Sequence, residues 1–147
     1  ANAERALRKA GECDPDFLDS YIVLGQLLNA EGKFSESVDV LKAGMRRSPD
    51  SWEFYYQLGV AQSGLKQSAA AEQSFEKVLV FNPHPPAGVY LKLADVYIME
   101  RSFDQAYQQM SKYLEADPHG RFVPRVKQIM KEMRSAGVLH SAASSTH

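Results

Sequence analysis

The sequence holds little that would support disulfide, metal or membrane chemistry. Its single cysteine, Cys13, excludes an internal disulfide framework and any metal site built from several cysteines. No apolar run approaches the roughly 18 residues that a membrane-spanning helix needs, so no membrane partner is expected. The formal net charge is only -1, which gives the whole chain no pull toward nucleic acid or an acidic membrane surface.

Catalytic motifs are missing as well. The chain has no glycine-rich phosphate loop, no nucleophile elbow and no His-Glu zinc helix. Glu72 and Glu76 are spaced for one helix face, but beside Lys77 they are typical of a solvated surface. The four histidines fall in expected turns or near the chain end, at His84, His119, His140 and His147. We therefore expect no catalytic residue, no metal and no cofactor, and predict that the chain is not an enzyme.

What the chain does have is an internal repeat. Dipeptides ending in proline recur at Pro15, Pro49, Pro83 and Pro118, with spacings of 34, 34 and 35 residues. Even spacing of this kind is the mark of a repeat architecture and is tested before local structure. Aligning the chain on these prolines brings further positions into register, namely Tyr21, Tyr55 and Tyr90, then Leu24, Leu58 and Leu93, then Gly25, Gly59 and Ala94.

Each unit is predicted to be a helix, a turn and a second helix. Apolar and small residues fall three and four apart in two blocks, which is the period of an amphipathic helix. The small residues let the two helices approach closely at their crossing. The turns at residues 30–34 and 63–68 hold a glycine where a helix can end in a left-handed residue, and the repeat proline stops the second helix.

This pattern resembles the tetratricopeptide repeat, whose signature is an aromatic, a leucine and a glycine, then alanine, phenylalanine, alanine and proline. The resemblance covers residues 3–118. It implies an all-α fold, a right-handed α-solenoid of antiparallel helix pairs with about eight helices. The predicted parts are the second helix of a truncated repeat (1–17), three units (18–51, 52–86 and 87–120), a capping helix (121–137) and a disordered tail (138–147).

The resemblance also implies a binding groove, because the first helices of successive units line a concave face in this family. Tyr56 is the expected anchor, since tyrosine often anchors interfaces. Lysines and asparagines that grip a terminal carboxylate in one chaperone-binding subset are absent here, which argues against carboxylate-clamp chaperone tails as partners. For each apolar residue, packing against a neighbouring helix is the open alternative. Carried over by register, the groove residues are Ile22, Gln26, Asn29, Tyr56, Val60, Leu91, Asp95 and Arg125.

The sequence thus predicts a non-catalytic protein-protein interaction module, a scaffold or adaptor that binds a peptide segment or a partner protein. Two alternatives stay open. The missing first half-repeat and the absent initiator methionine fit a substrate-recruiting piece of a larger enzyme such as a transferase. The apolar face left bare by that missing helix, around Leu7, would favour self-association. The basic stretch from Arg121 to Arg134 is explained by the polar face of a cap, so no nucleic acid partner is expected.

The segment FNPHPPAGVYLKL, residues 81–93, crowds three prolines and a glycine into a helical chain. Tyr55 and Tyr90 stay in register across it with only one residue added, as do Leu58 and Leu93. We therefore expect a joint within one repeat array, not a linker between domains. The joint is predicted to be rigid and slightly re-angled by the added residue.

Overall fold

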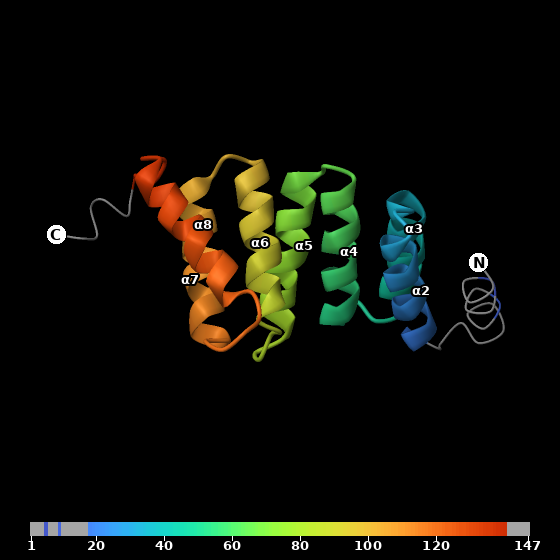
Figure 1. The fold of residues 1–147 in the computed structure, drawn as a ribbon. Helices are drawn as coiled ribbons and strands as arrows, with labels where there is room; N and C mark the ends of the chain where they lie inside the picture. Colours follow the sequence, from blue (N-terminus) through green and yellow to red (C-terminus); the bar gives the residue numbers. More distant parts are fainter. Residues whose placement is uncertain (1–4, 6–8, 10–17, 141–147) are drawn as a thin grey trace. The chain divides into compact units, whose positions relative to one another are not determined.

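A computed structural model describes residues 5, 9 and 18–140 (Figure 1). In this part of the chain every regular element is a helix and no strand occurs, which confirms the predicted all-α fold. Apart from residues 5 and 9, which are helical, the predicted helix over residues 1–17, including Leu7, lies outside the described residues, as do residues 141–147 of the predicted tail. The seven helices found there are α2 (Leu18–Ala30), α3 (Phe34–Met45), α4 (Trp52–Gly64), α5 (Ser68–Phe81), α6 (Gly88–Met99), α7 (Phe103–Ala116) and α8 (Val123–Ser135).

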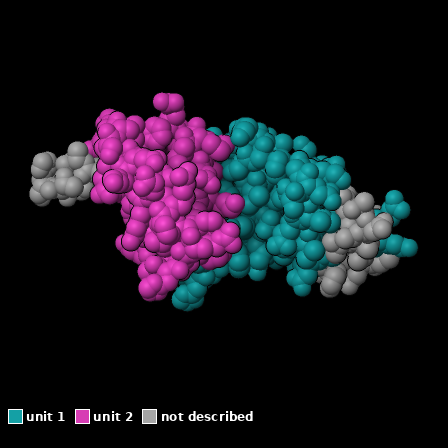
Figure 2. Space-filling view, in the orientation of Figure 1, with its two compact units in different colours: residues 1–85 teal, residues 86–147 magenta. Residues whose placement is uncertain are grey.

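The chain divides into two compact units, which Figure 2 shows in different colours. Unit 1 is residues 1–85 and contains α2 to α5, and unit 2 is residues 86–147 and contains α6 to α8. The division falls inside the proline-rich segment that follows α5. The predicted repeat boundaries and the predicted rigidity of this junction stay predictions.

Unit 1 is built from two helix pairs. In it α2 contacts α3, α3 contacts α4, α4 contacts α5, and α2 also contacts α4. One core cluster joins the two pairs, with Leu41 and Phe54 fully buried beside Leu58. Burying large apolar side chains of this kind contributes about 1.5–3 kcal/mol each.

Glycines allow the two helices of each pair in unit 1 to cross closely. A Cβ atom added to Gly25 would lie 2.5 Å from a methyl carbon of Leu41. A Cβ atom added to Gly59 would lie 2.7 Å from the ring of Phe75. Both separations are far below van der Waals contact, so a larger residue would push the helices apart.

The turn inside each helix pair contains one residue with a left-handed backbone. These residues are Gly32, Lys66 and Arg101, with φ of 77°, 63° and 60°. Our expectation that glycine fills this position is confirmed at Gly32 and is wrong in the turn at 63–68, where Lys66 takes it. Gly64 instead ends α4, and a Cβ there would lie 2.5 Å from the ring of Phe34, so its role is close packing.

Unit 2 contains one helix pair and a further helix. α6 contacts α7, and α7 contacts α8. α8 turns its predicted apolar stripe inward, because Val126, Met130 and Met133 are buried and Ile129 is half-buried. None of the helices in the described ranges is long and apolar enough to cross a membrane.

Candidate peptide-binding face

The predicted groove residues of unit 1 lie on two contacting helices. Ile22, Gln26 and Asn29 are on α2, at spacings of four and three residues that place them on one helix face. Tyr56 and Val60 are one turn apart on α4. Gln26 is exposed and the other four are half-buried, so this face, called here the unit 1 face, keeps part of its apolar surface open.

Asn29 ties α2 to α4. Its side-chain amide donates one hydrogen bond to the backbone oxygen of Gln57 at 3.0 Å and another to the Gln57 side-chain oxygen at 3.2 Å. The Asn29 Oδ1 atom is buried and has no hydrogen-bond partner within the described residues. Asn29 therefore positions the two helices of the unit 1 face, with its donor groups already engaged.

Tyr56 is held in place by the core beneath it. Its ring meets the buried ring of Phe75 edge-on, with centroids 6.0 Å apart and planes at 77°. Such a contact adds about 0.5–1.5 kcal/mol beyond the area that it buries. Burial raises the pKa of the Tyr56 hydroxyl above its ordinary value of 10.0. Tyr56 is thus a partly open aromatic side chain whose ring packs against the buried core.

Ile22 is less available to a ligand than its position suggests. It packs against the core cluster of Leu41, Phe54 and Leu58. For Ile22 the structure therefore gives weight to the packing alternative. Val60 is half-buried one turn after Tyr56 and extends the apolar surface of α4.

The remaining predicted groove residues lie in unit 2. Leu91 is half-buried on α6, Asp95 is exposed one turn later on the same helix, and Arg125 is exposed on α8. Loss of solvation among surrounding atoms raises the pKa of the Asp95 carboxyl, and the charge of Lys92 acts in the opposite direction. Because Asp95 is exposed, this shift reflects crowding around the carboxyl and not full enclosure. A single groove formed by both units stays a prediction.

Sequence reasoning did not identify the residues that support this face. Gln57 bonds Asn29 across 28 positions of the chain, and Phe75 supports Tyr56 from another helix. Only the repeat register could have pointed to them, since it places α2 beside α4 and α4 beside α5. Within the described residues no group of three or more His, Cys, Asp or Glu side chains could hold a metal ion.

Comparison with known proteins shows which proteins are similar to this chain. Residues 53–84, which span most of α4 and α5, match the family described as tetratricopeptide repeat. The chain is 26% identical over 126 residues to the BBSome complex member BBS4 homolog of Drosophila melanogaster, a match over 79% of this chain. The match covers 26% of that relative, so the chain spans about a quarter of its length.

Two solved structures share the fold. The crystal structure of MamA superposes with a TM-score of 0.80 at 25% identity, covering 92% of this chain and 77% of that one. The thermophilic TPR protein TTC0263 of Thermus thermophilus gives a TM-score of 0.74 at 20% identity, covering 88% of this chain and 70% of that one. Together with the helix pairs and the family match over α4 and α5, these likenesses show that the chain contains a tetratricopeptide repeat at residues 53–84 and has the fold of tetratricopeptide-repeat proteins.

Proposed function

We propose that this chain is a non-catalytic interaction module that binds a peptide segment of a partner protein across the first helices of its repeats. The observation that carries the proposal is Tyr56 on the unit 1 face. Its ring packs edge-on against Phe75 and remains partly open to solvent, one turn before half-buried Val60. Aromatic side chains that are held rigid before binding lose little conformational entropy in a complex, which suits them as anchors.

The rest of the unit 1 face is consistent with this role. Exposed Gln26 offers both a donor and an acceptor to an extended peptide backbone. The bonds between Asn29 and Gln57 keep α2 and α4 in fixed register, so the face need not rearrange to bind.

Two further observations support an interaction role. Repeats of stacked helix pairs present extended surfaces for partners. The matched Drosophila melanogaster relative is named as a member of a protein complex and is much longer than this chain. We infer that this chain serves as one binding segment of a larger assembly, in which its partner recognises the groove residues.

Comparative affinity capture from the native source tests the proposal. The bait is the chain itself, next to a variant with Tyr56→Ala and Val60→Ala and a control with Lys42→Ala and Gln73→Ala at exposed positions of α3 and α5. We expect the control to recover the same partners as the native chain and the groove variant to lose them. Circular dichroism confirms that each bait is folded. Equal recovery by a folded groove variant would refute the assignment of the face.

A further inference from the structure

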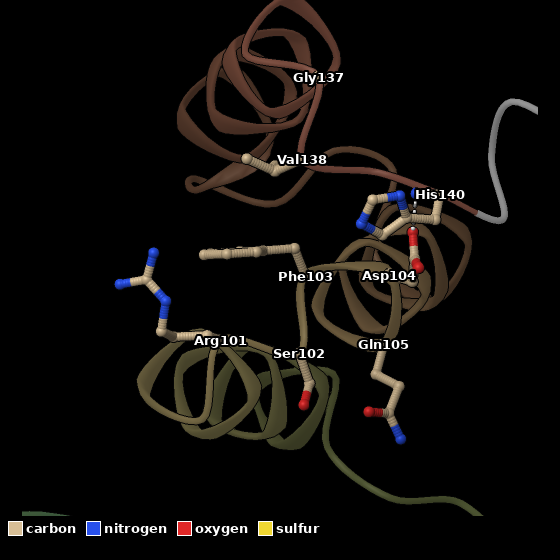
Figure 3. A pocket seen from close by; sticks show the side chains of 8 residues that line it. All are labelled: Arg101, Ser102, Phe103, Asp104, Gln105, Gly137, Val138 and His140. Carbon is tan, nitrogen blue, oxygen red and sulfur yellow. Dashed lines mark hydrogen bonds between the residues drawn. The ribbon is translucent and has the colours of Figure 1, made fainter.

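A pocket of about 650 Å³ lies in unit 2, between the turn that joins α6 to α7 and the segment that follows α8 (Figure 3). Its volume is in the range of ordinary ligand sites. Figure 3 shows the ring of Phe103 lying between the side chain of Val138 and the guanidinium of Arg101. The guanidinium carbon of Arg101 is 5.9 Å from the centroid of that ring. The pocket thus combines an aromatic and aliphatic wall with a cation.

The backbone holds this pocket in shape. The His140 backbone N-H donates a hydrogen bond of 2.8 Å to Asp104 Oδ1, which fastens the segment after α8 to the start of α7. Gly137 begins that segment with a left-handed φ of 68°. One oxygen of Asp104 accepts this bond, so the carboxylate helps to hold the wall of the pocket together. The guanidinium of Arg101 has no carboxylate partner among the described residues.

A row of cations on α8 leads toward the same place. Lys127, Lys131 and Arg134 are exposed and lie four and three residues apart, so they form one stripe about 10 Å long. The guanidinium of Arg134 stands 5.9 Å from the ring centroid of Tyr107. Tyr107 follows Phe103 by one turn of α7, so the stripe ends beside the pocket.

A capping role explains why this face of α8 is polar, but it does not explain why the charge on the face is positive. The stretch from Arg121 to Arg134 carries five cations and one acid, Glu132. None of the five forms an ion pair with a carboxylate in the described part of the chain. Like charges four residues apart, as at Lys127 and Lys131, destabilise a helix by about 0.2–0.5 kcal/mol. The first turn of α8 also lacks the acidic residue that the helix dipole favours. Acidic side chains would have solvated a cap equally well.

We propose that the stripe and the pocket together form a second binding site, which takes an acidic segment of a partner protein. Carboxylates of the segment contact Lys127, Lys131 and Arg134, and an apolar side chain next to them enters the pocket beside Phe103 and Val138. A polyanion without an apolar side chain fits less well, because it would leave the apolar wall of Phe103 and Val138 without a contact. This site lies within unit 2 and is separate from the unit 1 face.

Fluorescence anisotropy with short synthetic peptides tests this site. One fluorescein-labelled peptide consists of glutamates ending in phenylalanine, and a second ends in serine. The test variant is Lys127→Gln with Lys131→Gln, and the matched control is Lys42→Gln with Lys112→Gln, which removes the same charge from exposed positions elsewhere. We expect the phenylalanine peptide to bind more tightly than the serine peptide. The test variant should lose about tenfold in affinity and the control less than about twofold, because only the first removes cations in contact with the peptide.

Several results would overturn the proposal. They are absence of binding at low salt, equal loss in the test and control variants, equal affinity for both peptides, or tighter binding of polyuridine or phosphatidylserine vesicles than of the peptide. A further variant, Arg101→Asn, replaces the pocket cation by a neutral residue that tolerates a left-handed backbone. This variant should bind the phenylalanine peptide with lower affinity than the native chain does. Tyr56→Ala should bind both peptides normally, so a failure here leaves the unit 1 face untouched.

Discussion

One residue with a left-handed backbone closes the turn of each helix pair. The backbone N-H of the residue after it reaches back to a carbonyl in the preceding helix, from Lys33 to Leu28 at 2.8 Å and from Gln67 to Gln62 at 2.9 Å. Such bonds satisfy carbonyl groups that a helix end leaves without a partner. Lys66 adopts the left-handed backbone at a steric cost, because it has a Cβ atom, whereas Gly32 adopts it without that cost.

Replacing Lys66 with glycine should therefore stabilise the chain. Relief of the left-handed strain exceeds the extra chain entropy of glycine, and we expect the free energy of unfolding to rise by about 0.5–1 kcal/mol. Thermal or urea unfolding followed by circular dichroism measures the change. Lys66→Ala is the matched control, because alanine keeps the strain and should give no gain. A gain of equal size in both variants would show that the lysine side chain, and not its backbone, is responsible.

Tyr56 provides a pH-dependent signal from the unit 1 face. Burial raises the pKa of its hydroxyl above 10.0, so the folded state prefers the neutral phenol. Its contribution to stability is full below pH 10, the unfolded value, and is lost as the pH rises through the folded pKa. The difference in tyrosinate absorbance between the native chain and Tyr56→Phe should show a group titrating later than free tyrosine. A titration of Tyr56 at the pKa of free tyrosine would contradict its partly buried position.

The sequence predicts where the turn residues and Tyr56 lie along the helices better than it predicts which residues they contact. The glycine at Gly32 is visible as a turn signal, whereas a lysine or an arginine gives no sign that it will adopt a left-handed backbone. The repeat register alone assigns Lys66 and Arg101 to that position, since Lys66 follows Gly32 by 34 residues and Arg101 follows Lys66 by 35. The place of Tyr56 on α4 follows from register too, but its support by Phe75 depends on packing that no local pattern encodes.

Between elements, a buried polar pair joins α4 to α5. The Ser74 hydroxyl donates a hydrogen bond of 2.6 Å to Gln62 Oε1, and both side chains are buried. Gln62 stands where the repeat family often has an aromatic residue, and Ser74 supplies its partner. At the matching positions the preceding repeat has Leu28 and Val40, which need no hydrogen bond.

A double-mutant cycle on this pair should show strong coupling. Gln62→Leu leaves the Ser74 hydroxyl without this hydrogen-bond partner, and Ser74→Ala leaves the Gln62 side-chain amide without it. Each single substitution should lower the free energy of unfolding by about 1–3 kcal/mol. The double variant should lose less than the sum of the single losses, by about 1 kcal/mol. Chemical unfolding measures all three variants, with Gln73→Ala at an exposed position of α5 as control. Simple additivity would mean that the hydrogen bond contributes nothing.

At this scale the sequence predicts much of the structure. Apolar residues three and four apart fix the helix faces, so the order of the helices and the inward stripe of α8 could be predicted. The pocket in unit 2 could not, because the segment after α8 has no periodicity and meets Asp104 through a backbone hydrogen bond across 36 positions.

Across the whole molecule, the proline-rich junction is the feature that decides whether the predicted groove is continuous. On the unit 1 side it begins with a compact turn, in which the backbone N-H of His84 donates a hydrogen bond of 2.9 Å to Asn82 Oδ1. We predict that the junction is rigid and that its one added residue sets the angle between the units.

Spin labels on either side of the junction test this. Cysteines replace the exposed residues Gln73 on α5 and Gln108 on α7, with Cys13→Ser to remove the native thiol. Pulsed electron resonance should give one narrow distance distribution. Deleting Pro86 should move its centre and keep it narrow. A broad distribution in the native chain would show a flexible linker.

The most direct test of the proposed interaction role is photo-crosslinking from position 56. A photoreactive phenylalanine analogue replaces Tyr56 in one preparation and exposed Lys42 on α3 in another, and both are irradiated with extract from the native source. We predict that position 56 yields a discrete crosslinked partner, which excess unlabelled chain suppresses, and that position 42 yields none. Crosslinks of equal yield from both positions, or from position 42 alone, would contradict the assignment of the binding face.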